Sequence, residues 1–143
     1  MKKLSAIMLF ISLIMIGCTQ KKALRSELTN HGGIEYFLGE PFTGIALTYG
    51  VGGKINIEEY LKEGKTYKII FFDNQGNVTS KGEYDENEKM SGIWEEYENG
   101  LLKKETEYKN GEYDGSTKFY DSNGQLKYEQ VWKDGKLISE KTF

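Results

Sequence analysis

Three glutamates recur at the same place in successive stretches of the chain, and carboxylates in a row could hold a cation or carry out acid–base chemistry. Glu59, Glu83 and Glu107 are spaced by 24 residues, and each directly precedes an aromatic residue. In a meander, equivalent strands are two strands apart, roughly 9.5 Å at the usual strand spacing, whereas calcium ligands lie about 2.3–2.6 Å from the ion. The pattern favours a solvated face, with a cation-attracting stripe as the alternative.

The other reactive side chains are too few for a recognisable catalytic or metal site. His31 is the only histidine and Cys18 the only cysteine, so neither has a partner of its own type to complete a zinc site. Ser91 and Ser116 have no base near them in the sequence that could activate a hydroxyl. No phosphate loop or dinucleotide-binding fingerprint is present. We expect no enzyme, no cofactor and no metal centre.

The aromatic residues could bind a ligand through their rings. Five of them recur at intervals of 24 residues: Tyr36, Tyr60, Tyr84, Tyr108 and Trp132. The candidate binding or core aromatics are Tyr60, Tyr84, Trp94, Tyr97, Tyr108, Phe119, Tyr120 and Trp132. Rings on neighbouring strands can interlock into a core. The alternative is that a single sheet leaves them open as a shallow groove for a glycan or an extended peptide.

A turn follows each recurring aromatic, which indicates repeated hairpins. The turn residues are Gly39, Gly64, Gly111 and Gly135, with Asn87 taking the place of glycine after Tyr84. Asn-Gly between two strand-like runs is a strong hairpin signal. The clearest predicted strands cover residues 92–97, 101–108, 115–120, 126–132 and 136–143. We expect an all-β fold, an elongated antiparallel meander of hairpins with about 24 residues per repeat, and a bulge near Glu58-Glu59.

The chain resembles a known repeat family. One repeat contains Gly92, Tyr97, Asn99-Gly100, Glu105, Tyr108 and Asn110-Gly111. This spacing is similar to that of the MORN-variant repeat of bacterial proteins, many of them catalogued as YwqK-type antitoxins. The string Glu40-Pro41-Phe42-Thr43-Gly44 is similar to the one that commonly opens the first repeat there. The resemblance covers about residues 34–138. It implies a stack of β-hairpins, and its antitoxin label suggests inhibition of a toxin.

The N-terminus predicts export and a lipid anchor. A basic n-region precedes an apolar run over residues 6–16, which is well short of the roughly 20 residues of a membrane-spanning helix. Met15-Ile16-Gly17-Cys18 resembles the bacterial lipobox. We therefore expect residues 1–17 to be a lipoprotein signal peptide, cleaved between Gly17 and Cys18, with Cys18 lipidated.

The remaining chain divides into two parts. Residues 18–33 are polar and contain Gly32-Gly33, which predicts a lipidated cysteine followed by a tether, with His31 as a solvated linker residue. Residues 34–143 are the predicted repeat domain. The formal net charge of the chain is −3. With no basic block, nucleic acid is not an expected partner.

Together these features predict a protein that binds rather than reacts. Repeat proteins usually act by displaying a surface. We expect a non-enzymatic protein-binding or scaffold module on the non-cytoplasmic side of the cell envelope, at the outer membrane or cell surface if the source is Gram-negative. One alternative is a glycan or cell-wall binder that uses exposed Tyr and Trp rings. The other is an antitoxin-like inhibitor of a toxin.

Overall fold

A computed structural model describes residues 20–143. The predicted signal peptide (residues 1–17), the cleavage site at Gly17 and the lipidated Cys18 lie outside the described residues. In the described part, no helix is long and apolar enough to cross a membrane.

The described chain is almost entirely β-structure, as the sequence predicts. A ten-stranded sheet runs in the order β1-β5-β6-β7-β8-β9-β10-β11-β12-β13, and a three-stranded sheet has the order β2-β3-β4. The elements are β1 (Lys22–Leu24), the 3-10 helix η1 (Arg25–Glu27), β2 (Thr29–His31), β3 (Ile34–Phe37), β4 (Glu40–Pro41), β5 (Gly44–Tyr49), β6 (Ile55–Lys62), β7 (Lys65–Phe72), β8 (Val78–Tyr84), β9 (Met90–Glu98), β10 (Leu101–Lys109), β11 (Glu112–Tyr120), β12 (Leu126–Lys133) and β13 (Lys136–Thr142).

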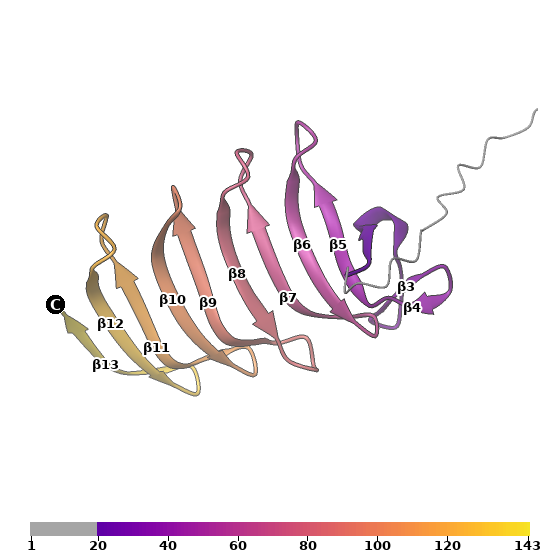
Figure 1. The fold of residues 1–143 in the computed structure, drawn as a ribbon. Helices are drawn as coiled ribbons and strands as arrows, with labels where there is room; N and C mark the ends of the chain where they lie inside the picture. The colour runs from indigo at the N-terminus through magenta and orange to yellow at the C-terminus, as the bar shows by residue number, and fades with distance from the viewer. Residues whose placement is uncertain (1–19) are drawn as a thin grey trace, which may run out of the picture.

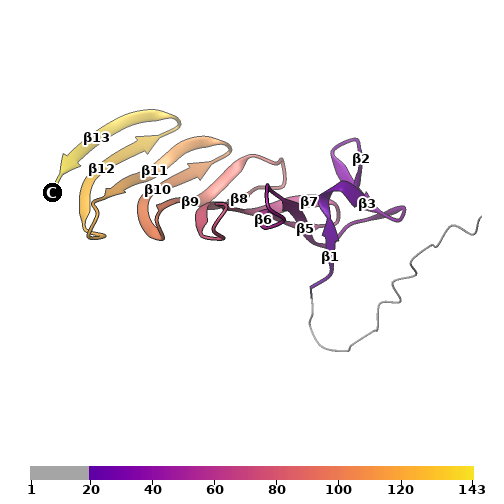
Figure 2. The ribbon, with the colours of Figure 1, turned by 90° about the horizontal axis from the view of Figure 1, so that it is seen from above.

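From β5 to β13 the strands follow one another as an antiparallel meander. The predicted elongated meander of repeated hairpins is therefore confirmed. Figures 1 and 2 show a single layer of strands, with β1 to β4 gathered at one end and β13 at the other. Among the described residues, the one parallel pairing lies at the N-terminal end, where β1 pairs with β5.

Two-residue turns close several of the hairpins. In the Asn110-Gly111 turn both residues have positive φ, 53° and 85°. Such a pair matches the type I′ turn, whose twist suits the flanking strands and whose conformation asparagine and glycine tolerate best. Asn99-Gly100 and Asp134-Gly135 have the same signs of φ. The Asn-Gly signals in the sequence therefore mark true hairpins.

A second kind of turn is organised by an aspartate. Asp73, Asp85 and Asp121 each accept hydrogen bonds through Oδ1 from backbone N–H groups two and four residues later. In two of these turns the fourth residue is glycine with positive φ, but in the β8–β9 turn it is Glu88, with φ 60°. The sequence predicted that Asn87 takes the glycine position of this turn. This is wrong, because the hydrogen bonds of Asp85 place the positive-φ residue one position later, at Glu88.

Residues 22–31, expected to belong to a tether, are folded. Lys22, Ala23 and Leu24 pair with Ile45, Ala46 and Leu47 of β5. This prediction failed because the segment is mostly polar and its few apolar residues show no clear period.

The N-terminal strands form a small core that caps the long sheet. Ala23, Leu28, Phe42, Ala46 and Leu61 form one buried cluster, and Phe37 packs against it. Burying apolar side chains contributes roughly 25 cal/mol per Å² of surface removed from water. The cap therefore anchors the first edge of the sheet with contacts that a single-layer meander cannot provide for itself.

The two faces of the long sheet differ in their side chains. On the ring face, Trp94, Thr106 and Thr117 are cross-strand neighbours, and Trp94 lies over Gly82. On the charge face, successive cross-strand partners form one row from β8 to β13: Lys81, Glu95, Glu105, Lys118, Glu129 and Lys141. In every strand that contributes to both rows, the two residues are neighbours in sequence. Because neighbouring residues of a strand point in opposite directions, the two rows lie on opposite faces.

Tyr60 does not share a face with the later recurring aromatics. Its neighbour Glu59 pairs with Ile69, which pairs with Gly82 on the ring face. Tyr60 pairs instead with Lys68, whose ammonium lies 5.1 Å from the ring centroid. The 24-residue interval therefore fixes the place of this residue along the chain but not its face.

The reason lies in the bulges. No register shift occurs between Ile57 and Tyr60, so the predicted bulge near Glu58-Glu59 is wrong. Register shifts occur on either side of that stretch. One lies in the β5–β6 pairing, between Thr48 and Tyr49 of β5, and the other in the β6–β7 pairing, between Tyr60 and Leu61 of β6. Because each bulge reverses the alternation of side chains, counting in twos from a recurring residue fails across it.

Candidate functional site

A continuous row of aromatic rings crosses the ring face. We define this ring row as Tyr84, Trp94, Tyr108, Tyr113 and Trp132. Successive centroids are 5.4, 6.3, 5.0 and 5.0 Å apart, with interplanar angles of 79°, 69°, 56° and 57°. These are edge-to-face and tilted contacts, the arrangements that aromatic quadrupoles prefer. All five residues are only half-buried.

Gly82 makes room for the central ring. A Cβ atom on Gly82 would overlap Cδ2 of Trp94, so no larger residue fits there without moving the indole. Trp94 Nε1 donates a hydrogen bond of 3.0 Å to the carbonyl oxygen of Glu83. Glycine in a strand weakens the strand itself but allows this close approach, and Trp94 is thereby fixed on the sheet.

Two buried threonines accompany the rings. Thr106 and Thr117 are each 2% exposed, and their hydroxyl oxygens have no hydrogen-bond partner in the described part of the chain. Nε1 of Trp132 is also buried without a partner. The ring face is thus covered by its own side chains rather than by a second layer of structure.

The structure brings together four of the predicted aromatics and separates the others. Tyr84, Trp94, Tyr108 and Trp132 meet in the ring row. Phe119 pairs with Tyr128 at a centroid distance of 5.5 Å, outside that row. The remaining predicted residues, Tyr60, Tyr97 and Tyr120, lie on the charge face, near Lys68, Lys81 and Glu105 respectively.

Tyr113 belongs to the ring row, although the sequence did not single it out. It lies off the 24-residue interval, two residues after the turn at Asn110-Gly111. Its position opposite Tyr108 across that hairpin is the signal that could have found it, because facing residues on a two-residue hairpin lie on one face.

The three recurring glutamates do not form one row. Glu59 lies on the ring face, where it accepts a salt bridge of 3.1 Å from Arg25. Glu83 and Glu107 precede ring-row residues and therefore point to the charge face. Oε1 of Glu107 accepts a 2.8 Å hydrogen bond from Ser116. Among residues 20–143, no group of three or more potential metal ligands is placed to hold an ion.

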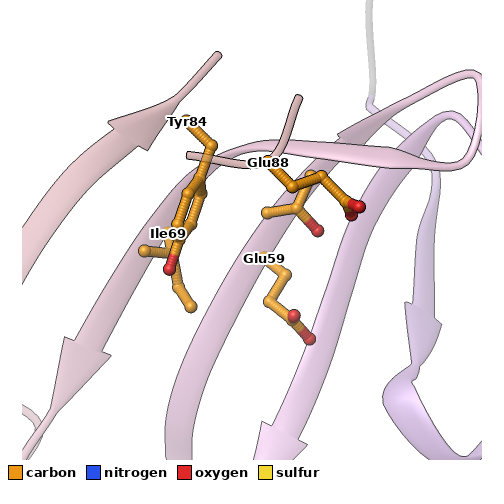
Figure 3. A pocket seen from close by; sticks show the side chains of 5 residues that line it. Glu59, Ile69, Tyr84 and Glu88 are labelled. Atoms are coloured by element: carbon orange, nitrogen blue, oxygen red, sulfur yellow. The ribbon is translucent and has the colours of Figure 1, made fainter. Parts of the chain in front are cut away.

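A cavity of about 240 Å³ opens beside the first ring of the row. Its walls are Glu59, Thr66, Ile69, Tyr84 and Glu88, and Figure 3 shows Glu59 and Glu88 beside Ile69 and the ring of Tyr84. Glu88 reaches this place from the β8–β9 turn. Because that turn has the longer aspartate form, the repeat is locally irregular at the cavity.

The ion pairs beside this cavity leave an excess of negative charge. Arg25 binds Glu35 at 2.7 Å and Glu59 at 3.1 Å, so one guanidinium serves two carboxylates. Burial raises the pKa of Glu59 despite the attraction of Arg25, and the charge of Glu35 raises it further. Burial also raises the pKa of Tyr84, with a contribution from the charge of Glu59.

A second cavity lies further along the ring row. It measures about 350 Å³ and is lined by Tyr108, Gly111, Glu112, Tyr113 and Gly135. Burial raises the pKa of Tyr108, and its hydrogen bond with Tyr113 acts in the same direction. Both cavities on the ring row therefore combine a tyrosine with a carboxylate.

His31 is part of the folded cap. It lies in β2, and its ring contacts that of Tyr36 edge-on at 5.7 Å. Its side chain is exposed, as expected for a linker residue, although the segment around it is a strand.

In comparisons with known proteins, no protein-family model matches the chain, and no curated protein matches it significantly.

Proposed function

We propose that this protein is a lipid-anchored, non-enzymatic protein-binding or scaffold module of the cell envelope, built on repeats of the MORN-variant type. The observation that carries the binding proposal is the ring row: five half-buried rings in mutual contact on a face that no second layer of residues 20–143 covers. Aromatic side chains are enriched at protein interfaces because they combine a large apolar area with little conformational entropy to lose.

The ring geometry favours a protein partner over a glycan. Sugar rings stack most readily on flat aromatic faces, whereas neighbouring rings in the row are inclined at 56° to 79° to one another and cover part of each other's faces. The continuity of the row supports a glycan binder as the second candidate.

A capture experiment tests the binding proposal. The bait is the full chain with Cys18→Ser in detergent, offered solubilised envelope proteins and purified wall polymer in separate reactions. Tyr113→Ala removes a ring of the row, and Tyr97→Ala removes a tyrosine from the charge face as the matched control. We expect a stoichiometric protein partner to be retained by Tyr97→Ala and lost by Tyr113→Ala.

Two other results would contradict this assignment. Sedimentation with wall polymer and no captured protein would make the protein a glycan binder. A partner lost by Tyr97→Ala but retained by Tyr113→Ala would move the binding surface to the charge face. Circular dichroism spectra of both variants establish whether each is folded.

The lipid anchor is tested separately. Expressed in a bacterium supplied with an alkyne-labelled fatty acid, the wild-type protein should acquire the label and partition with membranes. Cys18→Ser should lose the label and, if it stays uncleaved, keep the mass of the precursor. A labelled Cys18→Ser protein would rule out this residue as the attachment site.

A further inference from the structure

We propose that the ring face binds an extended partner segment with two cationic side chains, each lysine or arginine, one in each of the two tyrosine–carboxylate cavities. This inference rests on the proposed protein-binding function and specifies the chemistry of the partner. It follows from the composition of the cavity walls, the ion pairs around them and their separation along the sheet.

The first cavity can surround a cation on two sides. Glu59 and Glu88 supply carboxylates, and the ring of Tyr84 supplies a negatively polarised face, while Ile69 offers an apolar surface for the aliphatic stem. Lysine and arginine have this combination of an apolar stem and a charged head. An ammonium or guanidinium group close to both a ring and a carboxylate gains cation–π and ion-pair energy together.

The second cavity repeats this chemistry with different residues. Tyr108 and Tyr113 supply two rings, and Glu112 supplies the carboxylate. Gly111 and Gly135 carry no side chain of their own, and the space beside them is flanked by the aliphatic part of Lys89 and by the carboxylate of Glu112 respectively.

No lysine or arginine lines either cavity, whereas each of three other cavities in the described part of the chain has at least one among its walls. The two cavities on the charge face both include Lys81, and the cavity beside β1 and β5 includes Arg25. Within residues 20–143, Glu88 and Glu112 form no ion pair, and both are exposed. The ring face thus has unneutralised carboxylates beside its rings, and a cationic partner is the complementary one.

The separation of the cavities sets the spacing of the two cations. The walls of the first cavity come from β6, β7, β8 and the β8–β9 turn, and those of the second from β10, β11 and the adjoining turns, so we measure their separation from β7 to β11. Four strand spacings amount to roughly 19 Å. An extended chain that crosses the strands advances about 3.3 Å per residue, so the cationic residues should lie about six positions apart. An even spacing also places both side chains on the same side of an extended segment.

Intrinsic fluorescence provides a direct test, because both tryptophans of the chain, Trp94 and Trp132, belong to the ring row. The full chain with Cys18→Ser in detergent is titrated with a short serine- and threonine-rich peptide carrying lysines six positions apart. We expect a saturable change in fluorescence that weakens with added salt. Peptides with glutamate in place of lysine, or with the second lysine moved by one position, should bind more weakly.

Two variants locate the binding. Glu88→Gln and Glu112→Gln should each weaken peptide binding about three- to fivefold, the usual effect of one exposed charge contact reinforced by a ring. Glu86→Gln is the matched control: it lies in the same turn as Glu88, removes the same charge and lines neither cavity. It should leave the affinity unchanged.

Equal binding of the lysine and glutamate peptides would overturn the proposal, as would unchanged affinity in both Glu88→Gln and Glu112→Gln. These failures are distinguishable from failure of the proposed function. A protein partner could still be captured in a Tyr113-dependent way while the lysine peptide does not bind, and only the cationic chemistry would then be wrong.

Discussion

Glu88 occupies a backbone position that glycine holds in two otherwise similar turns. Its φ of 60° compares with 94° at Gly76 and 78° at Gly124. A residue with a Cβ atom pays roughly 1–2 kcal/mol for the left-handed conformation. The side chain of this strained residue lines the first cavity of the ring face. Strained residues often cluster at functional surfaces.

We therefore predict that Glu88→Gly stabilises the fold. Relief of the left-handed conformation should outweigh the greater entropy that glycine gives the unfolded chain, with a net gain of about 0.5–1 kcal/mol. Urea unfolding measures this gain. Glu86→Gly, in the same turn but without positive φ, should not stabilise. A loss of stability in Glu88→Gly would show that contacts of the glutamate outweigh the strain.

Glu59 predicts a pH dependence of stability. Its folded pKa is raised above 4.5, with burial as the largest cause. Between 4.5 and the folded pKa the native state binds more protons than the unfolded state, so the contribution of Glu59 decreases as pH rises through this window. We expect wild type to gain stability relative to Glu59→Gln as pH falls from 7 toward 4.5, measured by urea unfolding. A difference independent of pH would contradict the burial of this carboxyl.

Among the elements, β8 and β9 are joined on the ring face by an indole that packs against a glycine. Trp94 of β9 lies directly over Gly82 of β8 and bonds to the backbone of that strand. The pairing of these strands therefore depends on the absence of one methyl group as much as on the presence of the indole.

A double-mutant cycle tests this dependence. Gly82→Ala should destabilise the protein by about 2 kcal/mol, because the new methyl group displaces the indole of Trp94. Trp94→Ala alone should cost about 2–3 kcal/mol, less than for a fully buried ring. In the Trp94→Ala background, Gly82→Ala should cost almost nothing, since the clash is gone. Additive costs in chemical unfolding would show that the two residues act independently.

The same elements show what the sequence could predict. Hairpin turns such as Asn99-Gly100 and Asn110-Gly111 have a local cause, the positive φ that these residues tolerate. The strands between these turns could therefore be predicted correctly. The faces were harder, because a bulge reverses the alternation and depends on pairing with another strand. Tyr60 was thus grouped with rings on the opposite face, and Tyr113 was missed because it lies off the 24-residue interval.

The candidate cavities were beyond sequence reasoning for a related reason. Glu59 comes from β6 and Glu88 from a turn two strands further on, and only the register brings them to one cavity. The folded cap was missed as well, since the pairing of β1 with β5 is long-range and parallel, and no local pattern in residues 22–24 encodes it.

Over the whole molecule, contacts are made mostly between strands that are neighbours in sequence. The buried cluster lies at the N-terminal end, whereas every residue of β13 is exposed. Stability in such a stack is close to a sum of local terms. It should therefore be distributed unevenly along the sheet.

Hydrogen exchange measures this distribution. We predict the slowest amide exchange in β5 and β6, next to the buried cluster, and progressively faster exchange toward β13, where one edge is open to solvent. Mass spectrometry of peptic fragments resolves the strands. Uniform protection from β5 to β13 would indicate that the sheet unfolds as one cooperative unit.

The early start of β1 at Lys22 limits how far the domain could move from a membrane. Only three residues separate Cys18 from this strand, and even when fully extended that stretch of chain reaches about 14 Å. With an acylated Cys18, the cap would be held within one short reach of the lipid headgroups and could not search the surrounding space. Any partner would have to approach the bilayer surface, and the last strand, at the opposite end of the sheet, could extend farthest from it.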